Sequence, residues 1–257
     1  NVSSRLQLIQ MLWNKKDYNA VIAQSDAAHE YNPEEMVFYY FGGMAHYQKM
    51  DEDAALTEFR HGVAQINSKS NADLVSDLYA MMGDILYKKK DQAGAYAAYD
   101  SCLQWKDDNI MALNNYAYYM SEGGKNLHKA EAMSYKTIKA EPNNGTYLDT
   151  YAWILFMEER YAEAKTYIDQ ALKNCDSTAD NSVVFEHAGD IYAMNGLTDA
   201  GVDYWKQAYT DGHQTAVLKW KIDNKQYISA EELERRNNPK KMPLKDMKKT
   251  IKKGRRK

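Results

Sequence analysis

The stretch KAEPNNGTYLDTYAWIL, residues 139–155, joins the end of one helical pattern to the start of another. Pro142 ends the first pattern, because proline has no backbone N–H to donate and its ring clashes with the preceding turn of a helix. Apolar residues resume at helical spacing from Tyr147 onward, directly after an Asn-Asn-Gly turn. The stretch therefore predicts two helices that meet at a turn, and the next question is whether this junction recurs.

Junctions of this kind recur along most of the chain. Each pair of helical patterns has a small residue near the start of its second member, and these small residues lie 34 to 40 positions apart. They are Ala20, Ala55, Ala95, Ala130, Ala164 and Gly201. A repeat period in this range is typical of stacked helical hairpins rather than of a single globule.

The apolar pattern between the junctions is helical. Segments 77–89 and 162–173 carry apolar residues three and four positions apart, which is the period of one face of an amphipathic helix. No alternating apolar and polar run bounded by turn residues competes with this pattern. The sequence therefore predicts an all-α fold.

The repeats resemble the tetratricopeptide repeat (TPR), a helical hairpin of about 34 residues. Its small first-helix position is matched by Gly43, Gly83, Ala117, Ala152 and Gly189, and its late second-helix position by Ala27, Gly62, Cys102, Thr137, Ala171 and Ala208. Its bulky second-helix position is matched by Phe59, Tyr99, Ile168 and Trp205. Two helices pack closely only where a small residue lies at their crossing and bulky neighbours fill the grooves beside it.

The resemblance implies an α-solenoid, a right-handed superhelix of about six TPR hairpins. We place the hairpins near residues 1–33, 36–69, 76–109, 110–144, 145–178 and 182–215. Residues 216–238 are expected to form a C-terminal capping helix region, because the last repeat of an array needs a cover for its exposed apolar side. Residues 239–257 hold ten Lys or Arg against one acid and are expected to form a basic, flexible tail.

Composition limits the other function classes. The 257-residue chain has a net charge of −3, so the rest of the chain is acidic where the tail is basic. Two cysteines are too few for a disulfide framework. No apolar run is long enough for a transmembrane helix. The first residue is Asn1, and we expect any targeting signal to lie upstream of this segment.

Motifs of catalysis and cofactor binding are absent from the sequence. The chain has no HExxH, GxSxG, GxGxxG or phosphate-binding loop, and its six histidines are scattered. His187 and Asp190 share one helix face, but two groups are fewer than a zinc site requires. The sequence therefore predicts no enzymatic activity, no cofactor and no metal site.

The resemblance also implies a binding surface, because in TPR proteins the first helices line a concave groove. The positions carried over to this chain are Tyr40, Met44, Tyr47, Asp84, Tyr87, Asn114, Tyr118, Asp149, Trp153, Phe156, Glu186 and Asp190. Aromatic anchors among hydrogen-bonding groups are typical of peptide-binding hot spots. The alternative is that these aromatic residues simply pack against the neighbouring repeat, as most aromatic residues at helical spacing do.

The predicted function is a non-enzymatic scaffold that holds a peptide or protein segment in the groove. Acids outnumber the one predicted groove cation, Lys88, so the partner is expected to be apolar and basic and not a C-terminal carboxylate. The alternatives are self-association through the repeats, or a tether in which the basic tail contacts anionic lipid or nucleic acid. Specific nucleic-acid recognition is not expected, because the tail has no aromatic residue. The pattern also resembles the C-terminal part of larger bacterial TPR proteins of the cell envelope or periplasm.

Overall fold

The computed structural model describes residues 1–124, 126–176 and 179–238, and the predicted basic tail lies outside them. Within these residues the chain forms fourteen α-helices and no strand, which confirms the predicted all-α fold. The helices divide between two compact units, an N-terminal unit (Asn1–Ala140) and a C-terminal unit (Glu141–Lys257). No helix in the described part of the chain is both long and apolar enough to span a membrane.

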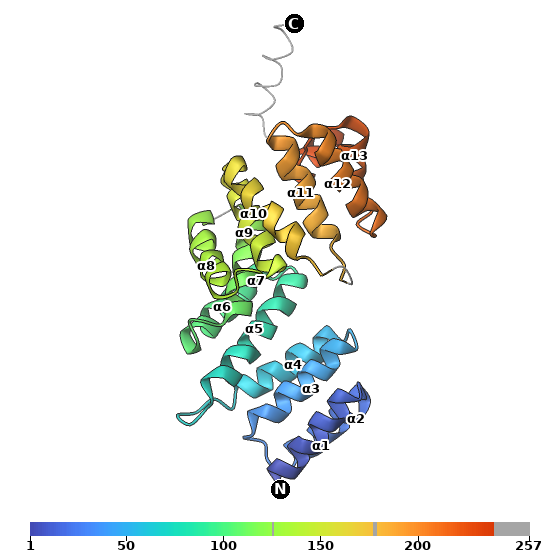
Figure 1. Ribbon diagram of the computed structural model, residues 1–257. Helices are drawn as coiled ribbons and strands as arrows, with labels where there is room; N and C mark the ends of the chain where they lie inside the picture. Colours follow the sequence, from blue (N-terminus) through green and yellow to red (C-terminus); the bar gives the residue numbers. More distant parts are fainter. Residues whose placement is uncertain (125, 177–178, 239–257) are drawn as a thin grey trace, which may run out of the picture. The chain divides into compact units, whose positions relative to one another are not determined.

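The N-terminal unit holds eight helices and the C-terminal unit six (Figure 1). The first eight are α1 (Val2–Asn14), α2 (Tyr18–His29), α3 (Met36–Gln48), α4 (Glu52–Val63), α5 (Ala72–Lys88), α6 (Gln92–Trp105), α7 (Ile110–Glu122) and α8 (Leu127–Ala140). The C-terminal unit holds α9 (Gly145–Met157), α10 (Tyr161–Asn174), α11 (Ser182–Met194), α12 (Thr198–Thr210), α13 (Ala216–Asn224) and α14 (Ala230–Asn237).

The turns inside several hairpins share one local construction. A residue in the left-handed backbone region precedes the second helix, and an aspartate then caps that helix in three of the hairpins. The left-handed residues are Lys16, Met50, Lys90 and Glu159. The capping aspartates are Asp17, Asp51 and Asp91, and each side chain accepts a hydrogen bond from the backbone N–H three residues later. Such caps satisfy donors that the first turn of a helix leaves unpaired.

The two helices of a hairpin are in close contact where the sequence pairs a glycine with a bulky residue. A Cβ atom added to Gly43 would lie 2.4 Å from the ring of Phe59. The same test at Gly189 places a Cβ 2.2 Å from the indole of Trp205. Both distances are shorter than any real carbon contact, so only glycine lets these helices approach so closely. This packing is the one that the repeat pattern predicted.

Within each unit, first helices contact one another as well as their own hairpin partners. In the N-terminal unit α3 contacts α5, and α5 contacts α7. In the C-terminal unit α9 contacts α11. Because consecutive first helices lie side by side, their outward-pointing residues share one face within each unit.

The helices that follow the last complete hairpin pack against it. Leu218 of α13 is fully buried in a cluster with Trp205 and Ala208 of α12. Ser229 accepts a hydrogen bond from the backbone N–H of Glu232 and so caps α14. The segment that the sequence assigned to capping therefore contains two short helices, and the first of them covers apolar side chains of α12.

Candidate functional site

The first helices of the N-terminal unit present a row of large side chains that are neither buried nor fully exposed. Tyr40 and Met44 on α3, Tyr47 at its end, Tyr87 on α5 and Tyr118 on α7 are all of this intermediate class. All but Tyr118 pack their inner parts on the cluster that contains Phe59 and Leu78. We call the surface formed by these five side chains the N-terminal face.

Lys88 lies beside this face and already has partners within the chain. Its Nζ atom donates a hydrogen bond to the Tyr47 hydroxyl at 2.5 Å and lies 4.6 Å from the centre of that ring. The carboxylate of Glu52 is 3.4 Å away. Burial alone would lower the pKa of Lys88, but Tyr47 and Glu52 raise it overall. This cation therefore orients Tyr47 rather than standing apart as a receptor for an anion.

Asp84 is a structural member of the N-terminal unit. Its Oδ1 atom accepts a short hydrogen bond from the Tyr99 hydroxyl and another, at 3.1 Å, from the side-chain amide of Asn115. Burial raises the pKa of Asp84, and the two hydrogen bonds oppose that rise. The side chain links α5 to α6 and α7, which fixes the spacing of the helices under the face.

Asn114 has a buried acceptor without a donor. The side chain is 5% exposed, and its amide nitrogen donates to Asn115 Oδ1 at 3.2 Å. Its own Oδ1 atom accepts no hydrogen bond from any residue that the structure describes. A buried carbonyl oxygen left in this state costs about 1–3 kcal/mol. Because the atom has almost no exposed surface, Asn114 belongs to the interior of the unit and not to the N-terminal face.

The predicted residues of α9 are buried within the C-terminal unit. Asp149 contacts His187 Nδ1 at 2.9 Å. The Trp153 ring stacks on His187 with 4.1 Å between centroids and on Phe156 with 4.9 Å. Tyr227, from the segment between α13 and α14, meets Phe156 edge-on at 5.3 Å. These aromatic side chains form one group of contacting rings, which joins α9, α11 and the segment between α13 and α14.

The predicted acids of α11 hold a buried lysine. Lys221 of α13 is 3% exposed, and its Nζ atom lies 2.8 Å from Glu186 and 2.7 Å from Asp190. Trp205 Nε1 donates to Asp190 at 2.8 Å. Burial alone would raise the pKa of Glu186, but the ammonium of Lys221 lowers it overall. The two carboxylates therefore anchor α13 to α11.

The structure divides the predicted site residues into two groups. Tyr40, Met44, Tyr47, Tyr87 and Tyr118 lie on neighbouring first helices with part of each side chain exposed. Asn114, Asp149, Trp153, Phe156 and Asp190 are buried, while Asp84 and Glu186 are partly buried. Every predicted acid has a partner within its own unit.

The sequence prediction left out His187, Lys221 and Tyr227, which hold the C-terminal group together. A signal existed for Lys221, because it stands three residues after Leu218 and next to Ile222 on the apolar side of its helix. A lysine on an apolar helix face needs a buried counter-charge.

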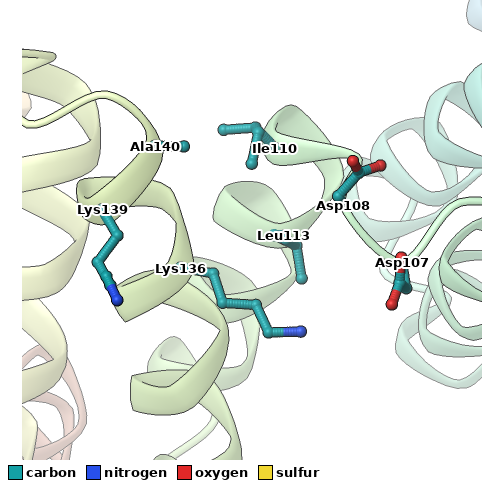
Figure 2. Close-up of a pocket in the computed structure, with 7 residues that line it drawn as sticks. All are labelled: Asp107, Asp108, Ile110, Leu113, Lys136, Lys139 and Ala140. Atoms are coloured by element: carbon teal, nitrogen blue, oxygen red, sulfur yellow. The ribbon is translucent and has the colours of Figure 1, made fainter.

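A separate hollow contains none of the predicted site residues in its lining. Its volume is about 410 Å³, and it is lined by Asp107, Asp108, Ile110, Leu113, Lys136, Lys139 and Ala140. Figure 2 shows the two aspartates on one side of this hollow and Lys139 on the other. Because two aspartates and two lysines line it, the hollow favours neither an anionic nor a cationic ligand.

Comparison with known proteins identifies the fold. No family model matches the sequence. One curated protein similar to this chain is the uncharacterized protein ycf37 from Porphyra purpurea, which is 34% identical over 79 residues. The match covers 31% of this chain and only 45% of that protein, less than half of its length.

Solved structures match far more of the chain. A tetratricopeptide repeat protein from Parabacteroides merdae is 15% identical, with a TM-score of 0.66 over 86% of this chain and 85% of that one. Pseudomonas aeruginosa pilF is also 15% identical, with a TM-score of 0.68 over 87% and 97% of the two chains. YrrB, a TPR protein described as having an unusual peptide-binding site, is 16% identical, with a TM-score of 0.54 over 68% and 86%. The predicted resemblance to TPR proteins is confirmed at the level of the fold.

Proposed function

We propose that this chain is a non-enzymatic scaffold that binds a segment of another protein on the N-terminal face. The observation that carries the proposal is the row of five partly exposed Tyr and Met side chains on three consecutive first helices. A protein surface rarely leaves so many large side chains together unless they meet a partner. Fold likeness to TPR proteins supports a scaffold in general terms.

The chemistry of this face favours apolar side chains in the partner. Tyrosine offers a large flat apolar ring with a polar tip, and few rotatable bonds have to be fixed when it binds. An extended or helical peptide can place its own apolar side chains between such rings.

Charge contributes less to this proposed recognition than the sequence alone suggested. Asp84 is held by Tyr99 and Asn115, and Lys88 is held by Tyr47 and Glu52. A basic side chain of the partner is therefore a secondary feature, and binding should depend weakly on salt because few exposed charges take part. A receptor for a free C-terminal carboxylate is not expected, since Lys88 already has its partners.

YrrB supports the choice of a peptide as ligand, since it is described as a TPR protein with a peptide-binding site. Its likeness to this chain lies in the fold, so it supports the class of ligand and not its identity.

The test is a selection of peptides from a random display library on three forms of the purified chain. These are the wild type, a Tyr47→Ala/Tyr118→Ala variant of the N-terminal face, and a Tyr31→Ala/Met50→Ala control. Tyr31 and Met50 are 75% and 82% exposed and lie outside the face, so the control removes similar side chains elsewhere. We expect the wild type and the control to enrich the same apolar peptides and the face variant to lose them.

Removal of one aromatic anchor typically costs about 2 kcal/mol of binding, so the double variant should weaken the selected peptides by about a hundredfold or more. Enrichment that is equal on the face variant and the wild type would contradict the proposal. Sedimentation of the same samples shows whether the chain self-associates, which would instead favour an assembly role.

A further inference from the structure

Three side chains of α2 and α4, none of them part of the N-terminal face, converge in the manner of metal ligands. Asp26 and His29 stand one helical turn apart on α2, and Glu58 comes from the second helix of the next hairpin. Their ligand atoms all lie within 4.8 Å of one another. His29 Nε2 and Glu58 Oε2 are 3.8 Å apart, which is too long for a hydrogen bond.

Buried polar atoms without partners concentrate at the same place. Within the described residues, five buried side-chain atoms make no hydrogen bond, and three of them belong to Ser25, His29 and Glu58. Ser25 is fully buried and stands one turn before His29 on the same side of α2. Each such atom costs about 1–3 kcal/mol when it is left unpaired. Three at one place indicate a polar ligand that satisfies them together.

Gly42 of α3 lets Ser25 and Glu58 pack closely beside its backbone. A Cβ atom added to Gly42 would stand 3.1 Å from Glu58 Oε2 and 3.3 Å from the Cβ of Ser25. Ser25 and Glu58 therefore approach the same bare stretch of backbone from two different helices. The His29 ring is held in place from its other side, because it stacks on Tyr39 with 3.9 Å between centroids and 13° between planes.

From this geometry we propose that Asp26, His29 and Glu58 bind a divalent transition-metal ion, with zinc as the best-fitting representative. Zinc bonds to imidazole nitrogen and carboxylate oxygen are about 2.0–2.2 Å long, so two tetrahedral ligands of one ion lie about 3.4 Å apart. His29 Nε2 and Glu58 Oε2, 3.8 Å apart, are therefore a few tenths of an ångström wider than in a bound site. Binding would require the three side chains to close around the ion, and Asp26 is exposed and so has room to rotate.

The donor set selects the class of metal. One imidazole with two carboxylates suits zinc and its neighbours, whereas calcium and magnesium prefer oxygen ligands alone. Three protein ligands leave a fourth position for water. The unpaired hydroxyl of Ser25 belongs to the same group of buried polar atoms.

An ion at this place would tie α2 to α4 and so join two successive hairpins. The proposal does not depend on the proposed function of the N-terminal face. Binding should raise the melting temperature of the chain, since an ion that binds only the folded state stabilises it.

The experiment is calorimetric titration of the whole, tag-free chain with zinc chloride after dialysis against a chelating resin, with a cobalt(II) spectrum as a second readout. The variants are His29→Phe, which keeps a ring to stack on Tyr39, and Glu58→Gln, which keeps the shape of the side chain. The matched control is His61→Gln, because His61 is exposed and also meets the Tyr39 ring, edge-on at 6.3 Å. Magnesium and calcium form the comparison titrations.

We expect one zinc ion per chain, with affinity at least about a hundredfold weaker in His29→Phe and in Glu58→Gln and unchanged in His61→Gln. Cobalt should give visible absorption bands in the wild type that both variants lack. Absence of zinc binding, or binding that survives His29→Phe while the melting curve shows a folded chain, would overturn the proposal. Equal affinity for magnesium would also overturn it.

Discussion

The first helices of the two units carry the same kinds of residue, but these residues have different roles in the two units. On α3, α5 and α7 the large side chains remain partly exposed, and on α9 and α11 the corresponding residues are buried among ring stacks and ion pairs. The difference comes from α13 and the segment after it, which supply Lys221 and Tyr227 to the C-terminal group. The side chains on α9 and α11 are thus covered by the chain itself, whereas those of the N-terminal face remain partly exposed and available to a partner.

The largest loss of folding stability that tests this comparison is expected on substitution of Lys221. A Lys221→Met variant leaves the buried Asp190 without its cation, while the partly buried Glu186 keeps His213 at 3.4 Å; breaking a buried ion pair in this way costs about 3–5 kcal/mol. Chemical denaturation followed by tryptophan fluorescence measures it, because three of the five tryptophans lie in the C-terminal unit. Lys219→Met is the control, since Lys219 is exposed and pairs with the exposed Asp223. A loss below about 1 kcal/mol would mean that α13 is not held by these carboxylates.

The second prediction concerns the close contact between a glycine and a buried ring, which both units contain. Gly43→Ala and Gly189→Ala each insert a Cβ atom against a buried ring, so each should destabilise its own unit by about 1–3 kcal/mol. Thermal unfolding and limited proteolysis report the loss in each unit. Gly124→Ala is not a clean control, because Gly124 has a positive φ of 60° and strain would be added there. A fully exposed helical site such as Gln104→Ala serves instead. Stability unchanged in both glycine variants would contradict the hairpin packing described above.

A third prediction separates binding from folding on the N-terminal face. Tyr47→Ala/Tyr118→Ala should lower the free energy of unfolding by less than Trp153→Ala, because the tyrosines are partly exposed and Trp153 is 9% exposed. Truncating a buried aromatic residue costs about 3–5 kcal/mol. Urea unfolding of the two variants gives the comparison. A larger loss for the tyrosine pair would show that the N-terminal face is part of the core.

The smallest expected effect is a pH dependence that comes from Asp84. Burial raises its pKa above the ordinary 3.8, so the folded state binds the proton more tightly than the unfolded state. Its contribution to stability is complete below about pH 4 and is lost as the pH rises through the folded-state pKa. Asp84→Asn keeps an oxygen to accept the bonds from Tyr99 and Asn115 and cannot titrate. Relative to this variant, the wild type should therefore lose stability as the pH rises above about 4. A wild type that gains stability over that range would reverse the assigned sign.

The local elements of the fold were predictable, because the residues that make them are near one another in sequence. Gly43 and Phe59, or Gly189 and Trp205, lie on the two helices of one hairpin, and their sizes alone predict the contact. Capping residues such as Ser229 are similarly local.

The contacts of the candidate site were not predictable in the same way. The membership of the binding surface stays a prediction, carried over from the TPR resemblance. The partner of Asp190 is Lys221, a full repeat away, and the pairing depends on how α13 packs against the last hairpin. The Asp26, His29 and Glu58 group was missed because its members come from two repeats, and no short motif with metal-ligand spacing contains them.

The most direct test of the proposed binding surface compares two methionines on first helices of the two units. The photoreactive residue p-benzoylphenylalanine is placed at Met44 of α3 or at Met194 of α11, and each protein is irradiated in a lysate of the source cells. Met194 is 38% exposed, so accessibility alone does not disqualify it. If a partner binds the N-terminal face, a discrete crosslinked product forms at Met44, and the Tyr47→Ala/Tyr118→Ala substitutions abolish it. No such product is expected at Met194. The same partner captured at Met194 and not at Met44 would contradict the proposed binding surface.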